Sequence, residues 1–313
     1  MRAKRLAQLV SFRRYRRCRE LFRRPLRAHG LLSGMSGGPF ELEFKDGGLV
    51  RCAAYRTDRA LWRFLLEELP PGSPVRAREG RVEFDWQGQR ISVRPNKADF
   101  FIFNEIYRAD DHGVAELPER LGTVIDLGGN IGLFSGRVAA RAERVLCVEP
   151  VSTNLAVARA NVEGCGAPGR VTLLPLAIGA RSGEQVRIHL SEITGLNSTR
   201  EEFTRRGGII GVEDVETISL EDLFSRHGVA RCDLLKCDVE GAEFDVFLEA
   251  PREVLARIDR LAMEVHLTAR QDDVARAEAL TRRLEEAGLR CRTEGETQPH
   301  GPGVMSYLLH ATR

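Results

Sequence analysis

Acidic side chains and a histidine accompany two short apolar runs in the second half of the chain. One run opens LLKCDVEGAEFDVF, residues 234–247, and the other lies within MEVHL, residues 263–267. The polar side chains concerned are Asp238, Glu240, Glu243, Glu264 and His266. Carboxylates and imidazole can take a proton from a reacting group, clamp a polar substrate or bind a divalent metal. These residues therefore form a candidate site for acid–base chemistry, substrate binding or metal binding.

The spacing within the two segments predicts how these side chains are arranged. Glu264 and His266 are two residues apart in an apolar run, so we expect both to face the same way. We expect Asp238 and Glu240 to point to opposite sides, so that one faces a pocket while the other packs or caps. Glu240 and Glu243 also fall before or in the first turn of a predicted helix, where the helix dipole favours negative charge. A structural role and a functional role both stay open for Glu240.

A glycine-rich loop, GGNIG, follows the apolar run TVIDL, residues 123–127. Glycines between a buried strand and a helix let the backbone approach a ligand, and the helix N-terminus offers free N–H groups. Dinucleotide-binding folds use GxGxxG at this place. This chain has Asn130 at the third position of that pattern, so a pyrophosphate finds a poorer cradle. The loop residues expected to contact a ligand are Gly128, Gly129, Asn130 and Gly132.

Three further charged residues stand at or near the ends of predicted strands. Glu149 closes the run LCVEP and can accept hydrogen bonds from both hydroxyls of a ribose, as acids at this place in nucleotide-binding sheets do. Asp126, just before the glycine loop, can shape the loop through its amides or contact an amino group of the ligand. Lys236 can pair with an acid beneath the pocket or be neutralised locally.

The order of predicted elements brings these residues to one edge of a sheet. From residue 122 onward strand-like and helix-like segments alternate, which indicates a doubly wound, mostly parallel α/β sheet with helices on both faces. Ligands of such sheets bind at the carboxyl ends of the strands. We expect this domain to span residues 99–313. A small α+β subdomain is expected over residues 41–98, and a basic arm with a glycine-rich linker over residues 1–40.

Some elements are predicted individually. VTLLPLAI, residues 171–178, is expected to form one strand of the sheet. SLEDLFSRHG is expected to form a helix with Ser219 as its N-cap. The last twenty residues are expected to add a strand pair that ends in VMSYLLH. In the N-terminal half, the turn QGQ between VEFDW and RISV predicts a hairpin.

Composition points to a globular protein of the cytoplasm. The 313 residues are 42% hydrophobic and 29% charged, which is ordinary for a soluble domain. No run approaches the ~18 apolar residues of a membrane helix, and the N-terminus lacks the apolar segment of a secretion signal. The seven cysteines are scattered without a CxxC pair, so we interpret them as structural thiols in a reducing compartment.

Charge is unevenly distributed. The formal net charge is +2, but residues 1–30 hold eleven Lys or Arg and one acid, Glu20, for a local charge of +10. The rest of the chain has 36 basic and 44 acidic residues, for −8. Such an arm can contact nucleic acid, an anionic membrane surface or an acidic partner. We favour the alternative that it is a solvated helix or an arm docked on the protein's own acidic surface.

Three motifs, in order along the chain, carry a resemblance to a known family. VIDLGGNIGLFS, VEPVSTNLAVARANV and especially LLKCDVEGAEFDVF resemble the FkbM family of S-adenosylmethionine-dependent methyltransferases. The resemblance covers about residues 97–268 and includes DFFIFNEIYR before the glycine loop. Family members commonly have Gly-Ala-Asn where this chain has Gly128-Gly129-Asn130. The resemblance implies a class I methyltransferase (Rossmann-like) fold, S-adenosyl-L-methionine as cofactor, and O-methylation of a hydroxyl on a sugar, glycan or natural product.

The resemblance also assigns roles to the candidate residues. The residues expected to bind the cofactor are Asp126, Gly128, Gly129, Asn130, Gly132 and Glu149. The candidates on the acceptor side, for catalysis, are Asp238, Glu240, Glu264 and His266. Asp238 is expected to lie nearest the methyl group, because it follows the buried strand residues directly. No metal is assigned. The expected partner is a small-molecule or glycan acceptor, and the sequence carries no sign of an oligomeric state.

Other functions are weighed against this one. An NAD-dependent oxidoreductase shares the order of strand, glycine loop, helix, strand and acid, but GxGxxG and a Tyr-xxx-Lys string are missing. A nucleic-acid methyltransferase is disfavoured because the Asn/Asp-Pro-Pro-aromatic and Pro-Cys strings of base methylation do not occur. A non-catalytic methyltransferase-like scaffold is disfavoured by the intact motifs.

Overall fold

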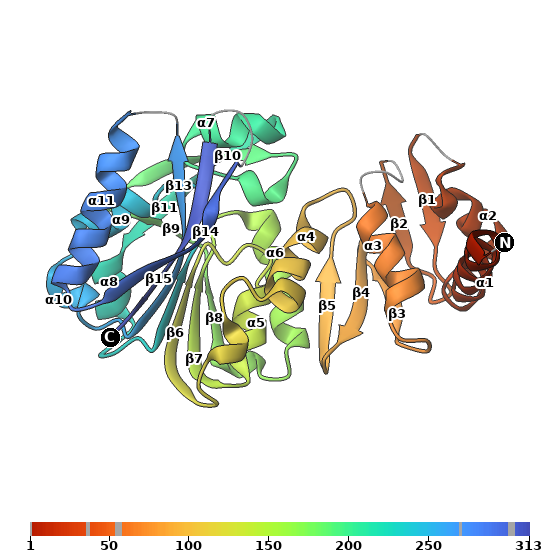
Figure 1. Ribbon diagram of the computed structural model, residues 1–313, viewed down its shortest axis with the longest axis horizontal. Helices are drawn as coiled ribbons and strands as arrows, with labels where there is room; N and C mark the ends of the chain where they lie inside the picture. Colours follow the sequence, from red (N-terminus) through yellow and green to blue (C-terminus); the bar gives the residue numbers. More distant parts are fainter. Residues whose placement is uncertain (1, 36–37, 54–57, 269–270, 300–303) are drawn as a thin grey trace. The chain divides into compact units, whose positions relative to one another are not determined.

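The computed structural model describes the chain except residues 1, 36–37, 54–57, 269–270 and 300–303. It divides into two compact units, Met1–Phe103 and Asn104–Arg313 (Figure 1). The boundary falls within the run DFFIFNEIYR, where α4 (Asp99–Phe103) ends and η3 (Asn104–Ala109) begins. Each unit is described by itself.

The first unit combines one helix of 20 residues and several short helices with two small sheets. Its sheets have the strand orders β1-β2 and β3-β4-β5, with antiparallel neighbours. The predicted VEFDW–RISV hairpin is confirmed as β4 and β5. The elements are α1 (Arg2–Leu21), α2 (Pro25–Gly30), η1 (Leu31–Met35), β1 (Phe40–Glu43), β2 (Leu49–Cys52), α3 (Arg59–Arg63), η2 (Phe64–Glu68), β3 (Val75–Arg78), β4 (Arg81–Trp86), β5 (Gln89–Val93) and α4.

The basic N-terminal segment takes part in the packing of this unit. Phe22, at the end of α1, is 1% exposed, and its ring centroid lies 4.7 Å from that of Phe44 and 6.4 Å from that of Trp62. Arg17 is buried and donates a hydrogen bond to the main-chain oxygen of Ser73 at 2.7 Å. Burial of these side chains fixes the C-terminal half of α1, although its sequence has no clean apolar stripe.

The second unit is built on a seven-stranded sheet with the order β14-β15-β13-β12-β6-β7-β8. Strands β8, β7, β6, β12 and β13 are parallel, so the predicted doubly wound, mostly parallel sheet is confirmed. These strands are rich in buried aliphatic residues, as expected for a sheet covered on both faces. The strands are β6 (Leu121–Leu127), β7 (Ala142–Val148), β8 (Val171–Leu174), β12 (Leu234–Cys237), β13 (Arg260–Thr268), β14 (Arg290–Pro299) and β15 (Val304–Thr312).

The strand pair predicted at the end of the sequence is present. β14 and β15 are antiparallel to each other, and β15 lies between β14 and β13 and is antiparallel to both. In this register His266 on β13 stands opposite Ser306 on β15. β15 therefore pairs with the strand that carries Glu264 and His266.

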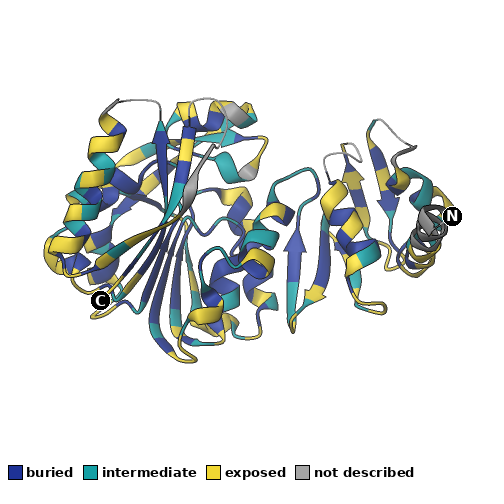
Figure 2. Cartoon of the chain, in the orientation of Figure 1, coloured by how far each residue is buried: buried dark blue, intermediate teal, exposed yellow. Residues whose placement is uncertain are grey.

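Helices cover both faces of the sheet. Figure 1 shows α8 to α11 gathered on one face and α5 with α6 on the other, and Figure 2 shows the buried strands between them. Leu280 and Leu284 of α11 join Phe244 and Phe247 of α9 in the buried core. The helical elements are η3, η4 (Val114–Glu116), α5 (Leu133–Ala139), α6 (Ser152–Gly164), η5 (Pro168–Arg170), η6 (Thr194–Leu196), α7 (Glu201–Thr204), η7 (Arg205–Gly207), α8 (Leu220–Arg226), α9 (Glu243–Glu249), α10 (Arg252–Leu255) and α11 (Gln271–Glu286).

A separate three-stranded sheet has the order β10-β11-β9, from β10 (Gln185–Ser191), β11 (Ile209–Ser219) and β9 (Ala177–Gly179). The expectation of one strand for VTLLPLAI is wrong. The segment divides at Pro175 into β8 and β9, which belong to different sheets, because proline cannot donate to a strand ladder.

The predicted cap of α8 is confirmed, since Ser219 Oγ accepts the Asp222 N–H at 3.2 Å.

All seven cysteines are free thiols. Six are buried, as expected for small apolar residues. Among the described residues, no helix combines the length and the apolarity that crossing a bilayer requires.

Candidate active site

The loop between β6 and α5 has a backbone that only glycine accommodates at two positions. Gly128 has a φ of +76°, and a Cβ on it would lie 1.7 Å from the main-chain oxygen of Asp238. A Cβ on Gly129 would lie 2.2 Å from Sγ of Cys147. The loop therefore passes directly over the ends of β12 and β7, and it brings the predicted cofactor-binding glycines beside the acidic segment after β12.

Asn130 and Gly132 complete the loop in left-handed conformations, with φ of +47° and +73°. The Asn130 N–H donates to Oε2 of Glu149 at 2.8 Å. Its Oδ1 is buried and makes no hydrogen bond with the described residues. A non-glycine residue in this region costs about 1 kcal/mol or more and persists where the surroundings fix it, often at functional sites.

Glu149 lies at the end of β7 with a side chain that is almost fully buried. Its Oε1 accepts hydrogen bonds from the Val151 N–H at 2.9 Å and from Nδ2 of Asn154 at 3.2 Å, in addition to the Asn130 bond on Oε2. Burial raises the pKa of Glu149 above its usual value, while these hydrogen bonds oppose that rise. A carboxylate accepts about four hydrogen bonds, so the Glu149 carboxylate can accept one more in addition to these three. Its contact with a ribose stays a prediction.

Asp126 and Lys236 form a buried pair beneath the loop. Asp126 is 0% exposed, and its Oδ2 accepts the Ser135 hydroxyl at 2.7 Å. Nζ of Lys236 lies 3.6 Å from Oδ1 of Asp126 and donates to the main-chain oxygen of Gly128 at 2.9 Å. Asp126 thus bonds the hydroxyl of Ser135 and pairs with Lys236, and its predicted bonds to the loop amides or to the ligand stay predictions. The predicted pairing of Lys236 with an acid is confirmed.

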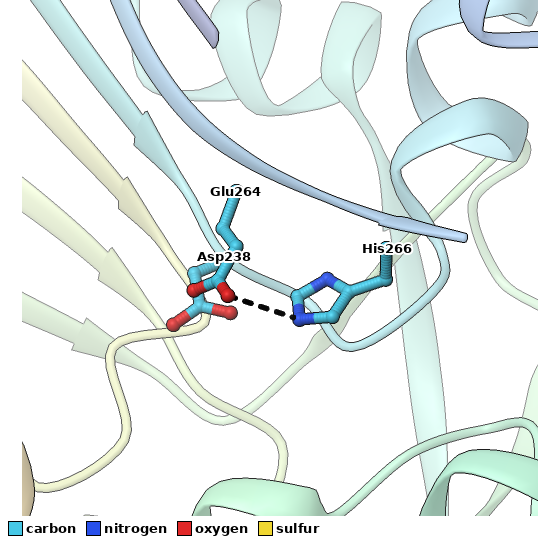
Figure 3. A group of neighbouring side chains, drawn as sticks. All are labelled: Asp238, Glu264 and His266. Atoms are coloured by element: carbon cyan, nitrogen blue, oxygen red, sulfur yellow. Dashed lines mark ion pairs between the residues drawn. The ribbon is translucent and has the colours of Figure 1, made fainter. Parts of the chain in front are cut away.

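The candidate catalytic residues come together at the carboxyl ends of β12 and β13. One ligand-type atom from each of Asp238, Glu264 and His266 lies within 4.8 Å of the others (Figure 3). Nε2 of His266 is 3.7 Å from Oε1 of Glu264 and 3.7 Å from Oε2 of Glu240. The prediction that Glu264 and His266 face the same way is confirmed. A parallel sheet aligns the ends of neighbouring strands, which brings residues distant in sequence to one point.

Glu243 fixes the orientation of His266. Both side chains are 0% exposed, and Nδ1 of His266 lies 2.8 Å from Oε1 of Glu243. Burial opposes a positive charge on His266, but the carboxylates of Glu240 and Glu243 outweigh burial and hold the pKa of His266 well above its ordinary value. Burial, with the charge of Glu264, raises the pKa of Asp238 above its ordinary value although Lys236 opposes the rise.

The expectation that Asp238 and Glu240 point to opposite sides is wrong, since both approach His266. Residues two apart along a strand share a face, and here the extended conformation also ends at Cys237. Glu240 has a φ of +50° and Gly241 a φ of +101°. The chain therefore turns at Glu240, which brings its carboxylate back toward the histidine.

The polar segment TGLNSTR supports this turn. Ser198 is buried, and its hydroxyl donates to the main-chain oxygen of Glu240 at 2.6 Å. Oδ1 of Asn197 accepts the Ser191 N–H at 2.8 Å and holds the segment against β10. A Cβ on Gly241 would lie 2.6 Å from the ring of Phe203, which fills the space beside the turn.

Two titratable residues near the start of this unit interact electrostatically with the site, and the sequence reasoning assigned them no role. Burial raises the pKa of Glu105 to about 8, and the charges of Asp238 and Glu264 add to that effect. His112 is buried, which lowers its pKa to about 3, and Lys236 acts in the same direction. The resemblance of DFFIFNEIYR, residues 99–108, to the segment before the glycine loop could have identified Glu105, whereas His112 lies outside that segment.

The sheet order and the reversed strand β15 are those of the class I methyltransferase fold. The family model described as "Methyltransferase FkbM domain" matches residues 126–291, more than half of the 313 residues. The chain therefore belongs to the FkbM methyltransferase family, which uses S-adenosyl-L-methionine as methyl donor. The oxidoreductase alternative is set aside on this ground.

Two curated proteins are similar to part of this chain. Methyltransferase sdnD of Sordaria araneosa is 31% identical over 182 residues, which are 47% of this chain and 66% of that protein. The AMB antimetabolite synthetase AmbE of Pseudomonas aeruginosa is 26% identical over 219 residues, which are 59% of this chain and 10% of that protein. The chain thus spans less than two thirds of the length of either relative.

Solved structures with a similar chain path include methyltransferase FkbM from Methylobacillus flagellatus, with 16% identity and a TM-score of 0.42 over 66% of this chain and 47% of that one. Aeropyrum pernix fibrillarin, solved with natively bound S-adenosyl-L-methionine, has 13% identity and a TM-score of 0.39 over 88% of this chain and 94% of that one.

The residues present fit the cofactor. The close backbone of Gly128 and Gly129 leaves no room for side chains, and Oδ1 of Asn130 and Oδ1 of Asp238 are buried acceptors without a hydrogen-bond partner among the described residues. S-adenosylmethionine carries an ammonium group and ribose hydroxyls, which are donors for such acceptors. Gly128, Gly129, Asn130, Gly132 and Glu149 would hold it.

Proposed function

We propose that this methyltransferase O-methylates a hydroxyl of a sugar, a glycan or a natural product. The observation that carries the proposal is the group of carboxylates and His266 at the ends of β12 and β13, directly beside the glycine loop. A neutral hydroxyl is a weak nucleophile and must lose its proton as the new bond forms. A nearby group of carboxylates provides acceptors for that proton.

When bound, S-adenosylmethionine supplies a methyl carbon that is open to attack. The chain's own part is to position the acceptor and to remove its proton. Asp238 and Glu240 are the two carboxylates that can take the proton. The raised pKa of Asp238 makes it a stronger base than an ordinary aspartate. Glu243 holds the His266 ring in one orientation, so that Nε2 faces the acceptor side.

The class of acceptor is inferred from the comparison with a curated relative. One curated relative is named an antimetabolite synthetase, which favours a small natural product over a macromolecule. We place the enzyme in the cytoplasm, because all seven cysteines are free thiols.

The test is methyl transfer from radiolabelled S-adenosylmethionine to a panel of sugars, glycolipids and hydroxylated natural products, with matched amines and carboxylic acids as competing acceptors. The product is examined by NMR for an O-methyl group. Asp238→Asn is expected to lower kcat by about 10²–10⁴, whereas Glu253→Gln, an exposed change on α10, is expected to leave it unchanged. Label found only on nitrogen or carbon contradicts the proposal.

For the basic arm we propose contact with an anionic surface, either a membrane or an acidic partner. Arg13, Arg16 and Arg19 are exposed on α1 and recur every three residues, so they can meet one surface. Sedimentation with phosphatidylserine vesicles should fall when the three are changed to Gln. Equal sedimentation of both forms would exclude the membrane contact.

A further inference from the structure

The acceptor side of the site has the composition and the geometry of a metal site. Asp238, Glu264 and His266 present two carboxylates and an imidazole whose ligand atoms lie within 4.8 Å of one another (Figure 3). We propose that these three side chains bind a divalent cation, best matched by Mn²⁺ or Mg²⁺, and that this cation holds the acceptor hydroxyl. The inference deepens the proposed O-methylation and rests on it for the identity of the group that the cation holds.

The spacing of the ligand atoms suits one ion. Ligand atoms at about 2.0–2.2 Å from a cation lie roughly 3–4 Å from one another. Nε2 of His266 and Oε1 of Glu264 are 3.7 Å apart, which is within that range. The full spread of 4.8 Å requires only a small closing movement of the side chains. Oε2 of Glu240, also 3.7 Å from the imidazole, is close enough to contact a ligand of the cation.

Neighbouring groups orient the ligands as they do in metal sites. A metal-binding histidine usually has its second ring nitrogen on a carboxylate, which fixes the tautomer and directs the other nitrogen at the ion. Nδ1 of His266 has this contact with Glu243 at 2.8 Å. The Ser306 hydroxyl donates to Oε1 of Glu264 at 2.7 Å from the facing strand β15. His266 and Glu264 are thus held by the buried partners Glu243 and Ser306.

The charge balance of the site independently calls for a cation. Its acids are Asp126, Asp238, Glu240, Glu243 and Glu264, and Lys236 is the cation that pairs with two of them. His266 must be neutral at Nε2 to bind a metal, so it does not offset these charges. Oε2 of Glu243, on a side chain that is 0% exposed, is a buried oxygen without a hydrogen-bond partner among the described residues, as is Oδ1 of Asp238. Buried carboxylates are costly unless they are paired or coordinate a metal. A divalent ion offsets the excess.

With the cation bound, each residue of the site has one role in methyl transfer. The acceptor hydroxyl binds the cation through oxygen, which lowers the pKa of that hydroxyl. Its O–H bond breaks, and the proton passes to Glu240. The new O–C bond forms as the C–S bond of the donor breaks, so the methylated acceptor and S-adenosylhomocysteine are the products. With Asp238 on the metal, Glu240 is the base of the two candidates. Carboxylate-rich sites favour Mg²⁺ and Mn²⁺, and the imidazole shifts the preference toward Mn²⁺.

Metal binding is tested directly on the full-length protein. The protein is treated with EDTA and desalted, and free Mn²⁺ is then followed by electron paramagnetic resonance during a titration. Calorimetry repeats the titration with Mg²⁺ and Zn²⁺. We expect one saturable Mn²⁺ site, with about tenfold or greater loss of affinity in Glu264→Gln and in Asp238→Asn. Far-UV circular dichroism shows that each variant is folded.

The matched control is Glu294→Gln. Glu294 pairs with Nε2 of His310 at 3.4 Å, and this pair is in no three-ligand group among the described residues. Mn²⁺ affinity should be unchanged in this variant. Equal loss in Glu264→Gln and Glu294→Gln, or no saturable binding by a wild-type protein that binds S-adenosylhomocysteine, would overturn the inference.

The two proposals fail in different ways. Full-rate O-methylation by the EDTA-treated protein overturns the metal site and leaves the proposed function standing. A saturable Mn²⁺ site in a protein that methylates only nitrogen or carbon overturns the proposed function and leaves the metal site standing.

Discussion

Replacing Gly128 by alanine tests whether the glycine loop is fixed by contact with the strand end beside it. The variant Gly128→Ala adds a Cβ that would lie 1.7 Å from the main-chain oxygen of Asp238. Gly166→Ala is a matched control in the same unit. Gly166 has a similar φ of +82°, and nothing lies within 4 Å of a Cβ built there.

The two variants share one cost and differ in another. A side chain in the left-handed region costs about 1–2 kcal/mol at either position. Only Gly128→Ala also forces two atoms apart by more than an ångström, and overpacking of this kind costs about 1–3 kcal/mol. The free energy of unfolding should therefore fall by about 2–5 kcal/mol in Gly128→Ala and by about 1–2 kcal/mol in Gly166→Ala.

Urea denaturation followed by far-UV circular dichroism measures the stability difference, and calorimetric titration with S-adenosylhomocysteine measures cofactor binding. Tryptophan fluorescence is an internal control, because both tryptophans, Trp62 and Trp86, lie in residues 1–103. It should report no change in that unit. Affinity for S-adenosylhomocysteine should fall about tenfold or more in Gly128→Ala only, because the loop must move to relieve the contact.

Equal losses of stability in the two variants would show that only the left-handed backbone conformation lowers the stability, and that the loop moves freely away from the main-chain oxygen of Asp238. Unchanged cofactor affinity in Gly128→Ala would refute the assignment of this loop to the cofactor. The first result would contradict the close approach of the loop to the end of β12, and the second would leave that approach standing.

Two other predictions concern buried acids. Burial raises the pKa of Asp58 from 3.8 to about 6. The folded protein therefore holds the Asp58 proton more tightly than the unfolded chain does. The free energy of unfolding falls by about 2–3 kcal/mol as the pH rises from about 4 to about 6. Asp58→Asn should remove this fall in thermal denaturation scans across that range, and an unchanged slope would contradict the prediction. Lys236→Met leaves the buried carboxylate of Asp126 without its cation and should cost about 3–5 kcal/mol in urea denaturation. The double variant with Asp126→Asn should recover part of that loss, and strict additivity of the two changes would count against the pairing.

Much of the sheet could be predicted because its signals are local. Buried parallel strands are continuous apolar runs bounded by polar turns, and TVIDL, LCV and LLKC have this pattern. The split of VTLLPLAI was foreseeable from Pro175, but the run of apolar residues around it outweighed that signal. β11 (Ile209–Ser219) was not predicted, because Glu213, Asp214 and Glu216 interrupt its apolar residues and leave no regular alternation.

The residues of the candidate site were predicted from the sequence, but their arrangement in space was not. The family motifs identify Asp238, Glu264 and His266, and strand alternation places the last two together. The turn at Glu240 was missed because its positive φ depends on support from Ser198, far away in the sequence. The role of Glu243 was missed for a related reason. An acid in the first turn of a helix is explained locally, and only the folded sheet shows that it holds a histidine of another strand.

The position of β15 has a consequence for how the protein folds during synthesis. β13 carries Glu264 and His266, and one of its two neighbours is β15, which follows only after α11 and β14. Until β15 is inserted, one edge of β13 exposes unpaired N–H and C=O groups, the kind of edge that pairs with other chains. During synthesis the sheet thus has an unpaired edge at β13 until β15 has been made. A chaperone that shields this edge would protect the part of the molecule on which catalysis depends.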